Sequence, residues 1–401
     1  MRTTSIRRRV AALPTATAVF LALAGGAAPT AGADSGSHVT CGQVLTEDVV
    51  LDADLVDCPG DGLVVGADGI RIELAGHEID GALTTRSVGI RNEGRDGVRI
   101  EDGVVQGFER GLLLAEGADR NLLRKLEVRG NSFHGIEVSA SDDTVVERST
   151  ISGNEGFGIF LEAAAGSRIA RNRTLDNAGG VVLSNSNGNQ AERNTTATNL
   201  NFGIFLFDSS RNTVERNAVS ENGEGGIFLI TDDVGSNENL IQRNTVTQNR
   251  GELPASGHGI VIDGERNRIK RNFIARNLAS GLLARADNRV EGNAIERNGT
   301  SGVVIGGSPG TLVVQNTVER NGADGILLSG GDGGGLVARN LARRNADDGV
   351  DVDVPGTTIA RNTANRNGDL GIEAVVGVVD GGGNRAAGNG NPLQCLNVLC
   401  T

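Results

Sequence analysis

The chain repeats one pattern of apolar and polar positions along most of its length. A glycine followed by Ile, Leu or Val recurs at steps of 21 to 24 residues, with a single step of 33. These glycines are Gly111, Gly135, Gly158, Gly180, Gly203, Gly226, Gly259, Gly281, Gly302, Gly325, Gly349 and Gly371. After each glycine, apolar residues alternate with other residues, and such alternation predicts a short strand.

Asparagine pairs keep step with the glycines. Two asparagines lie five residues apart in successive units, as in Asn217/Asn222, and aliphatic residues such as Val214 and Val219 flank the first of them. These segments are too short and too rich in Gly and Asn for helices. Each unit therefore predicts about three short strands. Because Gly and Asn accept left-handed backbone conformations, we also expect many tight turns formed by these residues.

One unit alone cannot bury its apolar face, whereas stacked units can. Equivalent side chains would then lie about 4.8 Å apart, and each stacked Asn could hydrogen-bond to those above and below it. We interpret these asparagines as ladder residues and not as ligands. The pattern predicts an all-β protein, a single-stranded parallel β-helix of about 15 coils, right-handed by the usual crossover preference.

The N-terminus has the features of a secretory signal. Arginines at positions 2, 7, 8 and 9 precede an apolar stretch over residues 10–23, and Ala31-Gly32-Ala33 fits a cleavage site. The alternative of a membrane anchor is weaker, because the apolar run is short and interrupted, and no later segment is long enough to span a membrane. We expect a protein that is secreted, extracellular or cell-wall associated.

Four cysteines form two tight groups near the ends, Cys41 with Cys58 and Cys395 with Cys400. In an oxidising compartment they predict a disulfide at each end, with local pairing as the natural interpretation among three connectivities. The C-x-x-C spacing of a metal site is missing. We divide the chain into a signal peptide (1–33), an N-terminal cap (34–62), a β-helix domain (63–390) and a C-terminal cap (391–401).

Charge and composition narrow the range of partners. Without residues 1–33, the chain has 34 basic residues against 50 acidic ones, so we expect no nucleic-acid partner. Trp and Tyr are absent, which removes the usual amphipathic platforms for sugar rings.

The recurring G-I-x-L and N-x-[VIL]-x-x-N-x-x-x-x-N motifs resemble the parallel β-helix (PbH1) repeats of the pectin-lyase-like superfamily, including NosD-like and carbohydrate-binding or sugar-hydrolase repeats. The stretch 74–81, LAGHEIDG, is similar to an early coil of such proteins. The resemblance covers roughly residues 60–390. It implies the fold, but not one activity, because the superfamily contains lyases, hydrolases, epimerases and proteins without known catalysis.

The coil with the 33-residue step carries two insertions, and insertions into one face of a solenoid often build a binding site. Asp232 and Asp233 open the first insertion and His258 closes the second, so the three could supply a general acid and base. Together with Arg268-Ile269-Lys270, they resemble the D-D, H-G and R-I-K signatures of pectin-hydrolysing glycosidases. The alternative is that they are solvated turn residues and an ordinary strand-entry histidine. Residues expected to bind substrate are Asp208, Phe205, Phe228, Arg268 and Lys270.

A second candidate catalytic group is acidic. Asp324 and Asp348 precede glycines at the same position of adjacent coils, and Asp347 lies beside Asp348; Asp351 and Asp353 follow. Stacked carboxylates would lie about 5 Å apart, which is close to the spacing of a retaining glycosidase pair. Such proximity raises one pKa or holds a cation such as Ca²⁺. The alternative is a set of exposed acids on an acidic surface. We predict no specific metal site.

Two further rows run along the predicted rod. An apolar row facing outward would need cover by loops, an apolar ligand or a second copy of the chain; its members are Phe160, Val182, Phe205, Phe228, Val261, Leu283, Val304 and Leu327. An arginine row precedes the second Asn of five successive coils, at Arg276, Arg297, Arg320, Arg344 and Arg366. Either Glu296 and Glu319 neutralise this row, or it binds an extended polyanion such as a uronate polysaccharide.

Two functions remain open from the sequence. The first is a secreted protein that binds and processes polysaccharide, preferably an acidic glycan, as a hydrolase or a lyase. The second is a non-catalytic β-helix that binds cell wall or another protein. A NosD-type role in metal maturation lacks support, because one Met and four His leave few soft ligands for copper.

Overall fold

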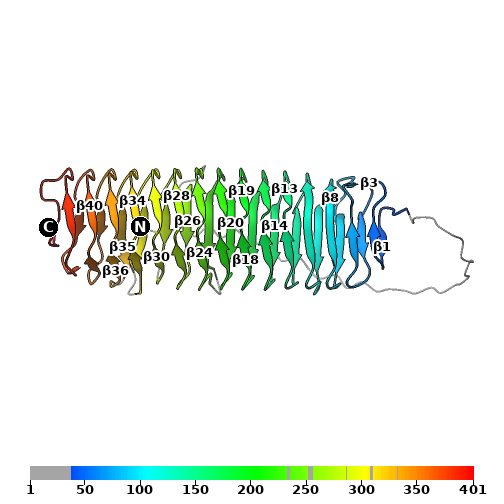
Figure 1. Cartoon of the computed structure of the whole chain (residues 1–401), viewed down its shortest axis with the longest axis horizontal. Coiled ribbons are helices and arrows are strands. Elements are labelled where there is room, and N and C mark those ends of the chain that lie inside the picture. Colours follow the sequence, from blue (N-terminus) through cyan, green and yellow to red (C-terminus); the bar gives the residue numbers. More distant parts are fainter. Residues whose placement is uncertain (1–37, 233–234, 252–255, 286, 308–309, 332) are drawn as a thin grey trace, which may run out of the picture. The chain divides into compact units, whose positions relative to one another are not determined.

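Residues 38–401 form one compact unit in a computed structural model of the chain, which describes residues 38–232, 235–251, 256–285, 287–307, 310–331 and 333–401. This unit is a solenoid of stacked coils (Figure 1). The predicted signal peptide and Asp233 lie outside the described residues. No helix long and apolar enough to cross a membrane occurs among the described residues.

Each coil contributes one strand to a parallel sheet of fifteen strands, here called sheet A, which confirms the expected number of coils. Its strands are β1 (Gln43–Leu45), β4 (Leu63–Val65), β7 (Val88–Glu93), β9 (Arg110–Ala115), β11 (Ile136–Ser139), β14 (Phe157–Glu162), β17 (Gly179–Ser184), β20 (Phe202–Phe207), β23 (Gly225–Ile230), β26 (His258–Ile262), β29 (Leu282–Ala284), β32 (Val303–Gly307), β35 (Ile326–Gly331), β38 (Val350–Val352) and β41 (Ile372–Ala374).

The remaining two thirds of each coil form two further rows of strands, here called sheet B. The first row consists of β2 (Val49–Val50), β5 (Arg71–Glu73), β12 (Val145–Glu147), β15 (Arg168–Ala170), β18 (Gln190–Glu192), β21 (Thr213–Glu215), β24 (Leu240–Gln242), β27 (Arg268–Lys270), β30 (Arg289–Glu291), β33 (Leu312–Val314), β36 (Leu336–Ala338), β39 (Thr358–Ala360) and β42 (Val379–Asp380). The second consists of β3 (Leu55–Cys58), β6 (Glu78–Gly81), β13 (Thr150–Ser152), β16 (Arg173–Leu175), β19 (Thr195–Ala197), β22 (Ala218–Ser220), β25 (Thr245–Thr247), β28 (Phe273–Ala275), β31 (Ala294–Glu296), β34 (Thr317–Glu319), β37 (Leu341–Arg343), β40 (Thr363–Asn365) and β43 (Arg385–Ala387). The long strands β8 (Arg99–Gln106) and β10 (Leu122–Arg129) take part in both rows.

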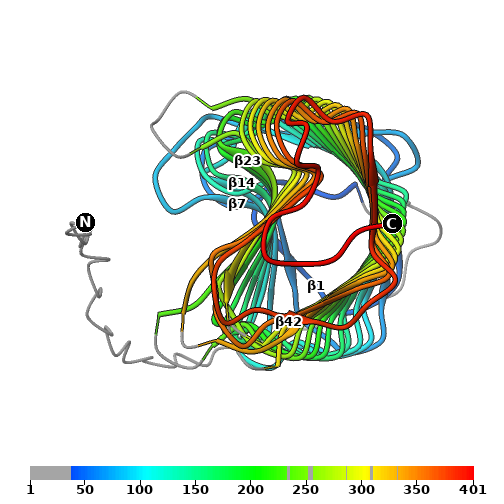
Figure 2. The same ribbon diagram turned by 90° about the vertical axis from the view of Figure 1, so that its left-hand side faces the viewer.

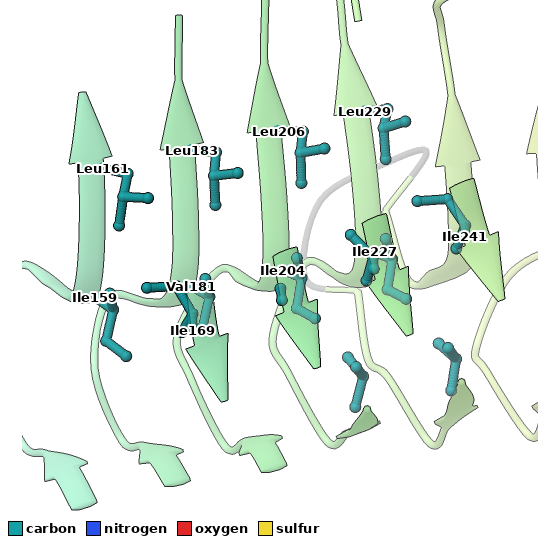
Figure 3. Close-up of a cluster of buried hydrophobic side chains, with 14 of the residues drawn as sticks. Ile159, Leu161, Ile169, Val181, Leu183, Ile204, Leu206, Ile227, Leu229 and Ile241 are labelled. Carbon is teal, nitrogen blue, oxygen red and sulfur yellow. The ribbon is translucent and has the colours of Figure 1, made fainter. Parts of the chain in front are cut away.

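Identical side-chain positions stack directly on one another, because strands pair in parallel and without a shift over most of the rod. Ile204 of β20 lies between Val181 of β17 and Ile227 of β23, for example, and all three are fully buried. Figure 3 shows such columns: the inward-facing residues of sheet A line up from coil to coil, and Ile169 and Ile241 of sheet B belong to the same buried cluster. Burying one aliphatic side chain of this size contributes about 1.5–3 kcal/mol, so the continuous core holds the coils in register. Seen along its axis, the rod shows coils that superimpose (Figure 2).

The recurring glycine is needed for space at the start of each sheet A strand. A Cβ on Gly203 would lie 2.4 Å from Cγ1 of Val219 and 2.8 Å from Nδ2 of Asn222. Contacts this short cannot be relieved by a small shift, because the valine and the asparagine are both buried.

The asparagines form buried ladders, as predicted. Nδ2 of Asn199 donates to Oδ1 of Asn222 at 3.0 Å, and Nδ2 of Asn222 donates to Oδ1 of Asn249 at the same distance. Each backbone N–H also donates to the Oδ1 of the next rung, as from Asn222 to Asn249 at 3.2 Å. Every rung thus satisfies polar groups that burial would otherwise leave without partners.

The expectation that Gly and Asn provide most left-handed turns is wrong for the coil corners. The left-handed residue there is mostly the one before the ladder Asn, and it is often Arg, as in Arg171, Arg216, Arg297 and Arg344, whose φ angles are 58°, 54°, 55° and 56°. The asparagines are committed to the ladder inside. The corner residue points outward, and its conformational cost of about 1–2 kcal/mol is offset by the rung that follows it.

Both predicted disulfides form with local pairing, Cys41–Cys58 and Cys395–Cys400. The segment expected as the N-terminal cap contains β1, β2 and β3, which make the first coil and pair with the second. The C-terminal segment lies against the last coils, because the backbone of Cys395 forms an isolated β-bridge with Ile372 and that of Cys400 forms one with Asn384. In this way the two ends of the hydrophobic core are tied by covalent bonds.

Candidate functional site

A column of polar side chains lies at the entry to sheet A, where the residue before the recurring glycine occupies the same position in every coil. In the last coils this residue is Ser301, Asp324, Asp348 and then Leu370. Oγ of Ser301 donates to Oδ2 of Asp324 at 3.3 Å, and the N–H of Asp348 donates to Oδ1 of Asp324 at 3.3 Å. The N–H of Leu370 donates to Oδ1 of Asp348 at 2.6 Å. Asp324 and Asp348 are buried, with 8% and 4% of their surface exposed.

The second part of the site is the outward-facing row of sheet A, which turns acidic over the same coils. Leu327 of β35 pairs with Asp351 of β38, and Asp351 pairs with Glu373 of β41. Oδ1 of Asp351 is buried and accepts no hydrogen bond within the described part of the chain. The side chains of Asp351 and Glu373 are half-buried. Two neighbouring carboxyls therefore face outward beside two buried ones.

Asp347 completes the group, here called the carboxyl cluster: Asp324, Asp347, Asp348, Asp351 and Glu373. One carboxylate oxygen each from Asp324, Asp347 and Asp348 lies within 4.8 Å of the others. Asp347 is exposed, whereas the other two are buried. The structure therefore brings together the second candidate group that the sequence predicts.

Burial and mutual repulsion favour the protonated form of these acids. Burial is the main cause that raises the pKa of Asp348 to about 8, and the contact with Glu373 raises it further. Burial is also the main cause that raises the pKa of Asp351 to about 7. Repulsion from nearby carboxylates, Asp353 first, adds to the effect. Burial likewise raises the pKa of Asp324. None of the ion pairs among the described residues includes a member of the cluster, so no cation opposes these shifts.

The cluster fits protons better than a calcium ion. Ca²⁺ takes six to eight oxygen ligands, whereas the close group offers three carboxylates. Donors from Ser301, Asp348 and Leu370 already engage the two buried carboxyls. We therefore derive no step that uses Ca²⁺.

The first candidate group does not come together. His258 begins β26 and pairs with Gly225 at the start of β23, whereas Asp232 follows the end of β23 at Ile230. The six residues of β23 separate the two positions, a distance of roughly 20 Å along the strand. Asp233 and residues 252–255 of the second insertion lie outside the described residues.

The expected substrate-binding residues are dispersed as well. Asp208 is 4% exposed, and its Oδ1 accepts the N–H groups of Asp232 at 3.0 Å and Gly235 at 3.2 Å, which fastens the turn after β23. Arg268 and Lys270 lie on β27 in sheet B. The pKa of Glu291 on the next strand is lowered mainly by its hydrogen bond with Arg289, and the positive charges of Arg268 and Lys270 lower it further.

Phe205 of β20 and Phe228 of β23 are neighbours in the outward-facing apolar row. Three of its eight members are buried and the other five are half-buried. Phe228 is 8% exposed and Val261 9%. The ring of Phe202, from the entry column, lies 4.9 Å from Phe205 and 4.6 Å from Phe228 between centroids. Aromatic residues of the chain itself therefore cover part of the apolar row.

Glu373 is the cluster member that the sequence analysis missed. It follows Gly371 by two residues, as Asp351 follows Gly349. Comparison of these outward positions between coils could have found it, since both occupy the position of Phe205 and Phe228.

Comparison with known proteins supports the architecture. The family model described as "Right handed beta helix region" matches residues 87–246 and 258–391. No curated protein matches the chain in sequence.

Among solved structures, the chain is similar to the A-module of mannuronan C-5 epimerase AlgE6 from Azotobacter vinelandii, with 16% identity, a TM-score of 0.48, and 89% of this chain and 91% of that one covered. It is also similar to the periplasmic alginate epimerase AlgG (14%, TM-score 0.39, 84% and 72% covered). A third is DFA-IIIase from Arthrobacter chlorophenolicus A6 (12%, TM-score 0.42, 69% and 66% covered). At these values the likeness concerns repeated coils and says nothing about activity.

Proposed function

Because the chain belongs to the right-handed β-helix family, its function must come from side chains on the outside of its coils, and we propose that it binds a polysaccharide and hydrolyses it at the carboxyl cluster. The family membership itself favours no substrate, since one fold supports many activities. Support for hydrolysis therefore comes from the chemistry of the carboxyl cluster.

The observation that carries the proposal is the pairing of Asp351 with Glu373 on the outward row. Adjacent parallel strands lie about 4.8 Å apart, and the two carboxyls of a retaining glycosidase are about 5–5.5 Å apart. Asp351, with a pKa of about 7, is able both to give and to accept a proton near neutral pH. An acid of this kind beside a second carboxyl is the combination that glycoside hydrolysis needs.

In the proposed mechanism, Asp351 donates its proton to the glycosidic oxygen while Glu373 attacks the anomeric carbon. The bond between that carbon and the glycosidic oxygen breaks, one part of the polymer leaves with a new hydroxyl, and the other forms an ester with Glu373. Ionised Asp351 then removes a proton from water, whose oxygen displaces the ester and restores both carboxyls. Asp324 and Asp348 act from behind as buried positioning residues.

The proposal extends to export and to an acidic glycan such as a uronate polymer. Two disulfides and the basic and apolar N-terminal segment support secretion. Exposed arginines along sheet B support an acidic polymer, because the guanidinium group binds carboxylates in a bidentate way.

Burial within the cluster favours a second candidate function, binding without catalysis. Asp324 and Asp348 are more than nine-tenths buried, so neither can touch a substrate without movement of the chain. On this alternative the cluster only shapes the end of the rod, and the long faces bind glycan, cell wall or another protein.

The test is incubation of the protein with polygalacturonate, alginate, hyaluronan and neutral glucans, with measurement of new reducing ends and of absorbance from unsaturated uronates. We expect reducing ends without unsaturation, and a loss of about 100-fold or more in kcat for Asp351→Asn and Glu373→Gln. Glu162→Gln, an exposed acid at the end of β14, is the matched control. Unsaturated products would instead indicate a lyase. Full activity in both cluster variants would exclude the proposed site.

A further inference from the structure

The arginine row defined above, Arg276, Arg297, Arg320, Arg344 and Arg366, runs along one corner of the rod. Each member precedes a rung of the same asparagine ladder and has a left-handed φ between 55° and 60°. All five are exposed. The ladder fixes the corner backbone in each coil, so the side chains leave the surface at one coil spacing, about 4.8 Å.

Part of this row carries charge that the protein does not neutralise. Arg297 pairs with Glu296 at 2.7 Å and Arg320 with Glu319 at 3.1 Å, which confirms the expected role of these glutamates. Arg276, Arg344 and Arg366 make no ion pair with any described residue. Stacked like charges repel one another, and surface pairs such as Arg297–Glu296 contribute little. The row is therefore arranged at a cost unless an anion binds it.

The surface is hollowed where the unpaired charges are adjacent. An open cavity of about 480 Å³ is lined by Arg344 and Arg366 together with Leu341, Arg343 and Asn365. Arg344 and Arg366 are neighbours in successive coils, since the N–H of Arg344 donates to the carbonyl of Asn365 at 3.2 Å. Three arginines thus border one depression, of which Arg343 pairs with Glu319, and no carboxylate is among its lining residues.

The row also leads to the carboxyl cluster. Arg320 lies four residues before Asp324, and Arg344 lies four residues before Asp348. A single turn with one ladder Asn joins each pair. A polymer lying along the row would therefore follow the edge of sheet A on which the cluster is located.

We propose that the arginine row is the binding track for an anionic polysaccharide with one carboxylate on each sugar, with Arg344 and Arg366 as its main contacts. A chain of uronate sugars laid parallel to the rod carries a carboxylate on every sugar, so several arginines of the row can each meet a carboxylate. The guanidinium group suits this partner, because it binds a carboxylate through two parallel hydrogen bonds. The inference rests on the proposed function for the identity of the polymer, but not for the position of the track.

The test is binding of polygalacturonate to the whole protein at several salt concentrations, with neutral dextran as the comparison polymer. Arg344→Gln combined with Arg366→Gln removes two charges, and glutamine already occupies an equivalent corner at Gln248, with φ 58°. Arg148→Gln combined with Arg171→Gln is the matched control. Both are exposed corner arginines, with φ of 54° and 58°, but they lie at a different corner of the coil, before the position of the first Asn of each pair.

We expect the first double variant to bind polygalacturonate about tenfold more weakly, with a smaller dependence on salt, and the control to bind like the unmodified protein. Lysine at both positions should restore part of the affinity. Equal losses in both double variants would mean non-specific attraction and would overturn the proposed track. Unchanged affinity in the Arg344/Arg366 double variant would overturn it as well. The same holds if the unmodified protein binds dextran as well as polygalacturonate, or does not bind polygalacturonate.

The two proposals fail in different ways. Binding that depends on Arg344 and Arg366, without release of reducing ends, would refute hydrolysis and leave the track in place. Hydrolysis that needs Asp351, with KM and affinity unchanged in the arginine variant, would refute the track alone.

Discussion

Nδ2 of Asn389 donates a hydrogen bond of 2.9 Å to Oε1 of Gln394, and the backbone N–H of Asn389 donates to the same oxygen at 3.1 Å. Gln394 therefore provides the contacts that the next ladder Asn would provide in a further coil. It does so from only five residues along the chain, because the C-terminal segment folds back over the last coil. The ladder of the rod is thus closed by a residue that belongs to no repeat.

Replacement of Gln394 by alanine should destabilise the C-terminal coils by about 1–3 kcal/mol, because Asn389 is buried and would lose the acceptor for two donors. In a solenoid, such a loss acts on neighbouring coils first. Hydrogen exchange should therefore accelerate in β40, β41 and β43 and not in β14. Gln248→Ala, at an exposed corner outside the ladder, is the control. Equal exchange in both variants would show that Gln394 does not close the ladder.

The carboxyl cluster should make the protein more stable in mild acid. The folded-state pKa values of Asp348 and Asp351, about 8 and about 7, lie above 3.8, the ordinary value of an aspartate carboxyl, which we take for the unfolded chain. Between about pH 4 and pH 8, the folded chain therefore holds more protons than the unfolded chain, and the free energy of unfolding falls as pH rises through this range. Urea unfolding at pH 5 and pH 8 measures the difference.

Asp348→Asn provides the test of that cause, because asparagine resembles the neutral acid. We expect the variant to be more stable than the unmodified protein at pH 8, by about 1–3 kcal/mol, and nearly equal to it at pH 4. Glu116→Gln, an exposed acid far along the rod, controls for the general effect of removing negative charge. A gain at pH 8 that is equal in both variants would assign the effect to net charge.

The two disulfides should differ in their effect on stability. Cys41–Cys58 closes a loop of 17 residues and Cys395–Cys400 one of 5. Because a longer closed loop restricts the unfolded chain more, alanine at both cysteines should cost about 3 kcal/mol at the first site and about 2 at the second. Limited proteolysis should show fraying that begins at β1–β3 or at the last coil, respectively. Fraying at the same end in both variants would contradict the prediction that each disulfide stabilises the end at which it lies.

The fold was predictable from the sequence because a repeat places the same demand on every unit. Inward residues such as Ile204 and Ile227, and rungs such as Asn222, occur at fixed intervals, so the number of coils and the ladders could be derived before any coordinates. The roles of individual corners were less accessible. A left-handed arginine such as Arg171 looks like any charged surface residue in sequence, and only the rung beside it explains its conformation.

The candidate site shows the same division. Spacing alone predicted that Asp324 and Asp348 stack, because both precede a recurring glycine. Spacing also suggested that Asp232 and His258 share a face, whereas the length of β23 separates them. The stacking of Glu373 on Asp351 could also have been found from spacing, but its contact with Asp348 joins two different columns, which spacing does not predict.

The sequence by itself determined the periodicity, the coil number, the ladder and the rows of like residues, because a parallel solenoid converts intervals along the chain directly into columns in space. Only the tertiary structure decided which side chains of different columns meet, how deeply Asp348 and Asp351 are buried, and which arginines lack a partner. Those properties depend on distances between columns and on exclusion of water, and no interval along the chain encodes either of them.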